Sequence, residues 1–184
     1  MREATTVDTR VPFLLVNVIG GVAVLGSYAW GIATHPESAG ALWGTLPDAV
    51  IPFYTGCMPF AAVGYLTVFA FLLAQPPEAV RFAGGPAFPW FLGSHAVFLL
   101  ASTLWMPLCF AALDGPNPGL LPLIQVVLAV AGGAAMVHII WLLRLVESPR
   151  PRLRKAAVVG AVFLMVQCTI LDALIWPRFF DVAS

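Results

Sequence analysis

Charged side chains are scarce in this sequence. Lysine, arginine, aspartate and glutamate together make up 10% of its 184 residues, whereas a soluble domain carries roughly 25%. The nine basic and nine acidic residues balance to a net charge of zero, and no basic stripe alternates with aromatic residues. Because nucleic acids are held mainly through their phosphates, we do not expect a nucleic acid as a partner.

Cysteines and known catalytic motifs are also few or missing. The three cysteines are widely spaced within apolar runs, so the sequence predicts neither a disulfide framework nor a zinc site. The sequence contains no Gly-x-Ser-x-Gly, His-Glu-x-x-His, Walker loop or Cys-x-x-Cys-His motif. These absences favour a protein without enzymatic activity, although they do not decide the question.

Apolar residues are abundant, with 60% of the chain hydrophobic and a mean hydropathy of +0.93. Five apolar runs each reach the roughly 20 residues that a helix needs to cross a bilayer. We therefore predict an all-α, polytopic bundle of five transmembrane helices within a single domain, residues 1–184. The first run follows acidic as well as basic residues, so we expect a retained helix rather than a signal peptide. The predicted spans are 12–32, 52–73, 88–113, 120–146 and 155–180.

The basic residues divide unevenly between the two sides of this bundle. Eight of the nine lie on the side of the N-terminus and of the second and fourth loops, and Arg178 alone lies on the other side. The positive-inside rule then places the N-terminus in the cytoplasm and the C-terminus outside, and we expect a bacterial inner (cytoplasmic) membrane. The eight are Arg2, Arg10, Arg81, Arg144, Arg150, Arg152, Arg154 and Lys155.

Tryptophans gather near both predicted membrane boundaries. Trp90 and Trp141 fall near the cytoplasmic one, and the outer one has Trp30, Trp43 and Trp176. Such positions are typical of interfacial aromatic belts. The longest outer loop, "ATHPESAGALWGTLPDAV", also contains two leucines, at positions 42 and 46. Together with its tryptophan, these either lie on the membrane surface or fold over the bundle as a lid.

Polar groups inside the spans mark a candidate ligand pocket. Asp172 is the only carboxylate within a predicted span, and intramembrane acids are often functional. The alternative is that Asp172 hydrogen-bonds a neighbouring hydroxyl or reaches the membrane interface near Arg178. Pro107 interrupts the third span, and a kink there would widen the space between helices. We predict a pocket near the outer face, open to an apolar small molecule, formed by Tyr54, Thr55, Trp105, Pro107, Gln125 and Asp172.

Two histidines form a second candidate site. His95 lies about seven residues into the third span, and His138 lies about seven residues before the end of the fourth. The short loop "DGPNPG" makes these spans antiparallel neighbours, so both imidazoles lie at similar depth. The pair could bind haem, or one histidine could ligate chlorophyll, as the Ala-x-x-x-His pattern that begins at Ala134 suggests. The alternative is a neutral pair that serves helix packing.

Two stretches rich in small residues predict close helix packing. These are Val18–Val24 in the first span and Ala129–Ala135 in the fourth. Small side chains allow membrane helices to approach closely. The stretches could serve packing within the bundle, a homodimer or docking to another membrane protein. An accessory or assembly subunit of a larger photosynthetic or respiratory complex is therefore one hypothesis for function.

Two short patches resemble a known family. "LWMPLCF" (Leu104–Phe110) resembles the Leu-Trp-Ser-Pro-Leu-Phe-Phe run of the third span in the translocator protein/benzodiazepine-receptor (TspO) family. "PFYT" (Pro52–Thr55) is similar to the Pro-Val-Trp-Thr that opens that family's second span. The resemblance implies a five-helix membrane protein that binds tetrapyrroles, sterols or related apolar ligands between its helices. It also implies that Tyr54 and Trp105 line the pocket.

The sequence departs from that family at several positions. The asparagine that precedes the family's third-span tryptophan by three residues is Ser102 here. The Trp-x-Pro-Pro loop signature and the Pro-Tyr-Leu-x-Trp of the last span are absent. Three hypotheses follow from the sequence: a binding or transport protein for an apolar ligand, an accessory subunit, and a haem- or chlorophyll-ligating protein.

Overall fold

The computed structural model describes residues 9–115, 117, 119–146 and 148–180. Within them, five helices are long and apolar enough to cross a membrane, which confirms the predicted fold class. The direction in which the bundle crosses the membrane stays a prediction. The helices are α1 (Arg10–Thr34), α2 (Ile51–Ala74), α3 (Phe88–Asp114), α4 (Leu120–Arg144) and a fifth helix of three parts, α5 (Pro151–Met165), η3 (Val166–Ile175) and η4 (Trp176–Arg178).

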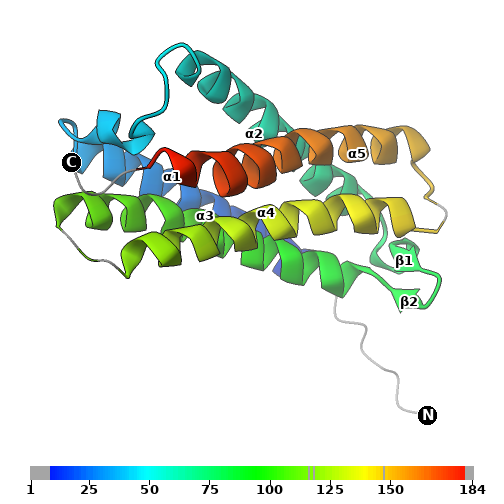
Figure 1. The fold of residues 1–184 in the computed structure, drawn as a ribbon. Helices are drawn as coiled ribbons and strands as arrows, with labels where there is room; N and C mark the ends of the chain where they lie inside the picture. The colour runs from blue at the N-terminus through cyan, green and yellow to red at the C-terminus, as the bar shows by residue number, and fades with distance from the viewer. Residues whose placement is uncertain (1–8, 116, 118, 147, 181–184) are drawn as a thin grey trace.

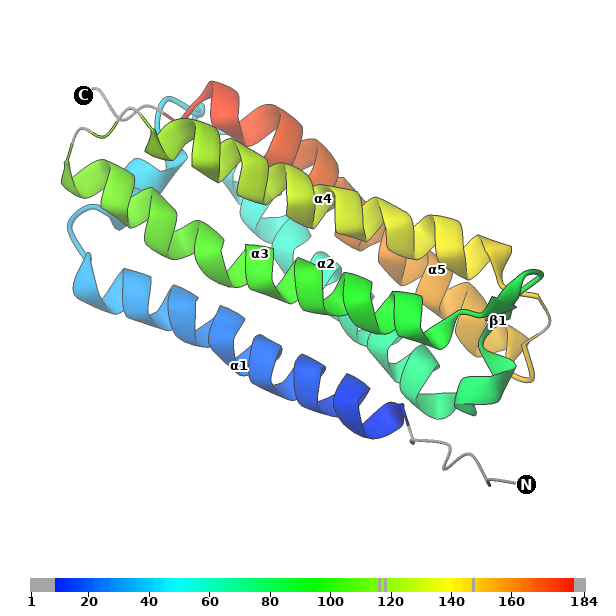
Figure 2. The same ribbon diagram turned by 90° about the horizontal axis from the view of Figure 1, so that it is seen from below.

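The helices pack in an order that differs from their order in the chain. The most extensive contacts join α2 to α5, α3 to α4, and α1 to α3, and α4 also packs along η3. Figures 1 and 2 show this arrangement, with α1, α3 and α4 side by side. Near its first turns α1 also meets α2, through stacked rings of Phe13 and Phe69 and a hydrogen bond from the Tyr65 hydroxyl to Asn17.

Glycines allow two of these helix pairs to approach closely. At the contact between α2 and α5, a Cβ atom on Gly64 would overlap the carbonyl of Gly160. On α4, a Cβ atom on Gly132 would lie 2.9 Å from the carbonyl oxygen of Cys168. Its neighbour Gly133 faces open space. The small-residue stretch of α4 is therefore used for packing on one side and is open on the other.

Arginines cap helix ends where most basic residues lie, which we call the basic end. The guanidinium of Arg154 donates to four carbonyls at the end of α4, with donor–acceptor distances between 2.8 and 3.1 Å. Arg10 donates to the carbonyl of Gln75 at the end of α2. Terminal carbonyls have no partner within their own helix, so these side chains satisfy them.

The loop between α2 and α3 at this end holds a short antiparallel hairpin, which the sequence pattern did not predict. Strand β1 (Arg81–Phe82) pairs with β2 (Gly85–Pro86). Gly85 has a φ of 142°, a backbone conformation that glycine adopts without steric cost. The two strands are two residues long and leave the all-α class unchanged.

The opposite end of the bundle is covered by the loop between α1 and α2, which contains η1 (Ala39–Trp43). Leu46 of this loop is 5% exposed and belongs to the apolar cluster around Tyr54. The loop is tied to the end of the last helix, because the Thr45 amide donates to the Phe179 carbonyl at 2.8 Å. Of the two predicted positions for the loop, the structure has the lid.

Trp176 is a correction to the predicted aromatic belt. Its side chain is 3% exposed, so it belongs to the interior of the protein rather than to the lipid interface. The indole N–H donates to the Leu42 carbonyl of the covering loop at 2.8 Å. Its ring also stacks on Phe180 at 4.4 Å. The covering loop buries Trp176, which the sequence pattern alone did not predict.

Candidate functional site

The last helix changes its winding around the candidate acid. Residues Val166–Ile175 form a π-helix, which is rare and occurs often at functional sites. Five residues complete a hydrogen-bonded turn in this geometry, so Gln167 and Asp172 lie on one face. The Gln167 amide donates to Oδ1 of Asp172 at 2.8 Å. Thr169 of the same segment donates to the Gly132 carbonyl of α4 at 2.8 Å, which fixes the segment against its neighbour.

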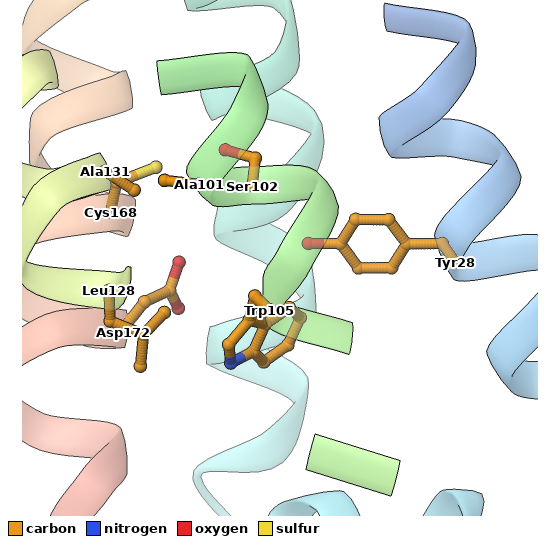
Figure 3. A pocket seen from close by; sticks show the side chains of 8 residues that line it. All are labelled: Tyr28, Ala101, Ser102, Trp105, Leu128, Ala131, Cys168 and Asp172. Atoms are coloured by element: carbon orange, nitrogen blue, oxygen red, sulfur yellow. The ribbon is translucent and has the colours of Figure 1, made fainter. Parts of the chain in front are cut away.

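The Asp172 carboxylate faces a small cavity between α1, α3, α4 and η3. Figure 3 shows the Tyr28 hydroxyl directed toward this space from one side and the carboxylate from the other. The Ser102 hydroxyl lies above them in this view and Trp105 below. The residues that line the cavity are Tyr28, Ala101, Ser102, Trp105, Leu128, Ala131, Cys168 and Asp172. We call this space the Asp172 cavity.

The cavity is small, with a volume of about 50 Å³, and is partly open at the surface of the bundle. Ligand pockets for drug-sized molecules measure ~300–1,000 Å³. The space therefore accommodates one or two water molecules or a polar group of a few atoms. A complete tetrapyrrole or sterol ring system would require the surrounding helices to separate.

Some polar atoms around the cavity have no hydrogen-bond partner among the described residues. The indole N–H of Trp105 is buried and has no partner there, and the same holds for the Gln167 side-chain oxygen. Only Oδ1 of the Asp172 carboxylate accepts a hydrogen bond from a described residue. An aspartate near the middle of a membrane helix costs about 3 kcal/mol on insertion scales. Asp172 lies six residues before Arg178, ~9 Å from the helix end, so its cost is lower but still favours a partner.

The structure brings together two of the six residues predicted for the pocket. Trp105 and Asp172 both line the Asp172 cavity. Tyr54 lies nearby in the apolar cluster beneath the covering loop, where its hydroxyl donates to the Leu171 carbonyl at 2.6 Å. That bond satisfies the hydroxyl of Tyr54, and the residue does not line the cavity.

The other three predicted residues lie elsewhere. Thr55 is exposed and bonds the carbonyls of its own helix, at Ile51 and Pro52. Gln125 is exposed on the outer face of α4. Pro107 lies within α3, which continues through it to Asp114, and it does not line the cavity. Residues at one depth point in different directions around their helices, and depth alone was the basis of the prediction.

Two polar residues of the site were not singled out as site residues in the sequence. Ser102 lies one turn before Trp105 on α3, and this i, i+3 spacing on one helix face was the signal that could have found it. Gln167 is five residues from its partner, and α-helical spacing places such residues on different faces. Its role depends on the π-helix, for which the sequence shows no signal that we recognise.

The two buried histidines also meet, as their equal predicted depth allowed. Both are 0% exposed, and Nε2 of His138 lies 3.0 Å from Nδ1 of His95. The Phe91 carbonyl lies 2.8 Å from that same Nδ1. A carbonyl only accepts, so Nδ1 of His95 carries a proton. Ser94 lies 2.9 Å from Nε2 of His138 and completes a polar group between α3 and α4.

This arrangement does not fit a haem iron held between the two histidines. Two axial histidines direct their nitrogen lone pairs at a metal between them, whereas the facing nitrogens here are hydrogen bonded to each other. The rings of Phe13, Phe91 and Phe98 pack around the pair. No group of three potential metal ligands occurs among the described residues. The two ring nitrogens that face away from this contact, Nε2 of His95 and Nδ1 of His138, have no hydrogen-bond partner among the described residues. Ligation of a chlorophyll by one of them stays a prediction.

Comparison of the chain with protein-family models, with characterised proteins and with solved structures gave no match. The resemblance to the translocator protein family therefore rests on the two sequence patches alone. The class of protein that the fold defines is an integral membrane protein with five helices able to span the bilayer.

Proposed function

We propose that the chain is a non-enzymatic membrane protein that binds, and in this way carries, an apolar small molecule with one small polar group. The polar group enters the Asp172 cavity, and the apolar remainder lies between the helices and the lipid. The observation that carries the proposal is the convergence of Tyr28, Ser102, Trp105 and Asp172, from three helices, on one partly open space.

The burial and the hydrogen bonding of the residues at the cavity support ligand binding there. Gln167 is 4% exposed and donates a hydrogen bond to Oδ1 of Asp172. The other oxygen of this carboxylate is therefore left to interact with a ligand in the cavity. The buried indole N–H of Trp105 has no hydrogen-bond partner among the described residues, which costs about 1–3 kcal/mol. A ligand whose polar group donates a hydrogen bond to the carboxylate satisfies the site better than a purely apolar one.

The resemblance to the translocator protein family agrees with this site at one position. Trp105, which the resemblance assigns to a ligand pocket, lines the Asp172 cavity. A sterol, which carries one hydroxyl on an apolar body, suits a cavity of about 50 Å³ better than a tetrapyrrole with two carboxylates does. For either ligand, we expect α1 to move away from α3 and α4 on binding.

The test is the identity of molecules that remain bound after gentle extraction from the native membrane. Mass spectrometry of the wild-type protein should find a stoichiometric amphiphile, and Trp105→Phe and Asp172→Asn should lose it while staying folded. Trp90→Phe is the matched control, because Trp90 is exposed at the basic end of the bundle. A ligand-free wild type, or variants that retain the ligand, would refute the proposal.

A second candidate is an accessory or assembly subunit of an energy-transducing membrane complex. The open faces at Gly21 and Gly133 favour it, since a Cβ atom at either glycine would meet nothing within 4 Å. Another helix could approach closely at these positions, from a partner or from a second copy. Blue native electrophoresis in mild detergent distinguishes the two, because a subunit migrates with its partners and a carrier migrates alone.

A further inference from the structure

The charged and polar groups around the Asp172 cavity indicate the chemical class of its ligand. We propose that the cavity binds the protonated amino group of an apolar primary amine, an inference that rests on the proposed function. The carboxylate of Asp172 supplies the negative charge, and Tyr28, Ser102 and Trp105 surround the ammonium group.

No described residue that lines the cavity supplies a positive charge to balance Asp172. Among the described residues that line the cavity none is basic, and the other polar groups are a phenol, a hydroxyl, a thiol and an indole. Arg178, the basic residue on this end of the last helix, is exposed six residues further along. A nearby cation stabilises an ionised carboxylate away from water, because attraction between opposite charges strengthens as the dielectric constant falls.

The hydrogen-bond acceptors around the cavity match the donors of an ammonium group. Gln167 occupies Oδ1 of Asp172 and leaves Oδ2 without a hydrogen bond from a described residue. The hydroxyl oxygens of Tyr28 and Ser102 are further acceptors beside the same space. A primary ammonium group has three donors, which matches this set of acceptors.

The volume of the cavity and the aromatic rings beside it also favour a primary ammonium group. The rings of Tyr28 and Trp105 lie 5.7 Å apart, centroid to centroid, and both border the cavity. Cations are attracted to the faces of such rings. A volume of about 50 Å³ accommodates a primary ammonium group more readily than the bulkier trimethylammonium group. We therefore expect selectivity for primary over quaternary amines.

The experiment compares two probes of equal chain length, n-hexylamine and n-hexanol. The full chain is placed in nanodiscs of phosphatidylcholine, and binding is measured at pH 7 by isothermal titration calorimetry against protein-free nanodiscs. We expect the wild type to bind the amine at least about tenfold more tightly than the alcohol, as a charge-assisted hydrogen bond provides. Hexyltrimethylammonium should bind as weakly as the alcohol.

Two variants test whether the preference for the amine depends on Asp172. Asp172→Asn should abolish the preference for the amine, and Asp48→Asn, at an exposed aspartate of the covering loop, should keep it. Circular dichroism and melting temperature establish that both variants are folded. If Asp172→Asn does not fold, Ser102→Ala provides the test, because it should weaken amine binding more than alcohol binding.

The remaining outcomes separate this inference from the proposed function. Equal binding of amine and alcohol, lost in Trp105→Phe, would overturn the cation preference and leave the apolar-ligand site in place. A preference for the amine that persists in Asp172→Asn would also overturn the inference. Failure of both probes to bind the wild type would overturn the inference and count against the proposed function as well.

Discussion

Gln167 and Asp172 are five residues apart in the chain, and their side chains are joined by a hydrogen bond of 2.8 Å. In an α-helix these positions point about 140° apart, at 3.6 residues per turn. The π-helix from Val166 to Ile175 brings them onto one face. The position of the carboxylate in the cavity thus depends on backbone winding as much as on side-chain identity.

We predict that Gln167→Leu destabilises the protein by about 1.5–3 kcal/mol, because a buried carboxylate loses its hydrogen-bond donor. Gln125→Leu is the matched control, since Gln125 is exposed on the outer face of α4. Unfolding of both variants in detergent, followed by circular dichroism, measures the difference. Equal stability of the two variants would show that the bond between Gln167 and Asp172 contributes little.

At the basic end, we predict that Arg154→Lys lowers the free energy of unfolding by about 1–3 kcal/mol. Lysine keeps the charge but has no planar fork with which to reach the four carbonyls that Arg154 satisfies. Arg152→Lys, at an exposed position two residues away, is the control. If both variants were as stable as the wild type, the charge rather than the geometry of Arg154 would matter.

At the contact between α2 and α5, we predict that Gly160→Ala destabilises the protein by roughly 1–3 kcal/mol through overpacking. A Cβ atom there would overlap the Thr67 hydroxyl and the backbone of Gly64. Gly133→Ala, whose added Cβ meets open space, should leave stability unchanged or raise it slightly. Thermal melting of the two variants in the same detergent makes the comparison. A stable Gly160→Ala would mean that the helices separate there at little cost.

For the histidine pair, we predict that His138→Leu lowers stability by about 1–3 kcal/mol and leaves iron content unchanged. The first effect follows because His95 and Ser94 lose a buried partner. The second follows because the hydrogen-bonded geometry does not fit an axial pair. Metal analysis by mass spectrometry and the visible absorption spectrum provide the measurements. Bound iron that disappears in the variant would reverse this conclusion.

The five helices could be predicted from sequence because apolar runs of sufficient length have one ordinary explanation in a chain with few charges. The predicted ends of the helices also lay within a few residues of the observed ends. The fifth helix begins earlier than expected, at Pro151 rather than residue 155, since proline is favoured in the first helical turn. The basic residues before residue 155 lie in that first turn, and for this reason the sequence suggested a loop.

The site was harder to predict, because its residues depend on helix rotation. Trp105 and Asp172 face inward, whereas Thr55 and Gln125 at a similar depth face outward. All five helices are apolar around most of their circumference, so no polar face shows which side is buried. Gln167 could not be found, because the change to π-helical winding has no recognised signature here.

The packing order has a consequence for synthesis of the chain. Helix α2 makes its most extensive contacts with α5, which is the last helix to be made, and comparatively few with α1. The covering loop likewise obtains its partners, Trp176 and Phe179, from the final turns. While α3 and α4 are being inserted, Gly64 of α2 therefore faces lipid instead of Gly160. A chain that stops before residue 151 leaves this face of α2 exposed, which makes the last helix the step that closes the bundle.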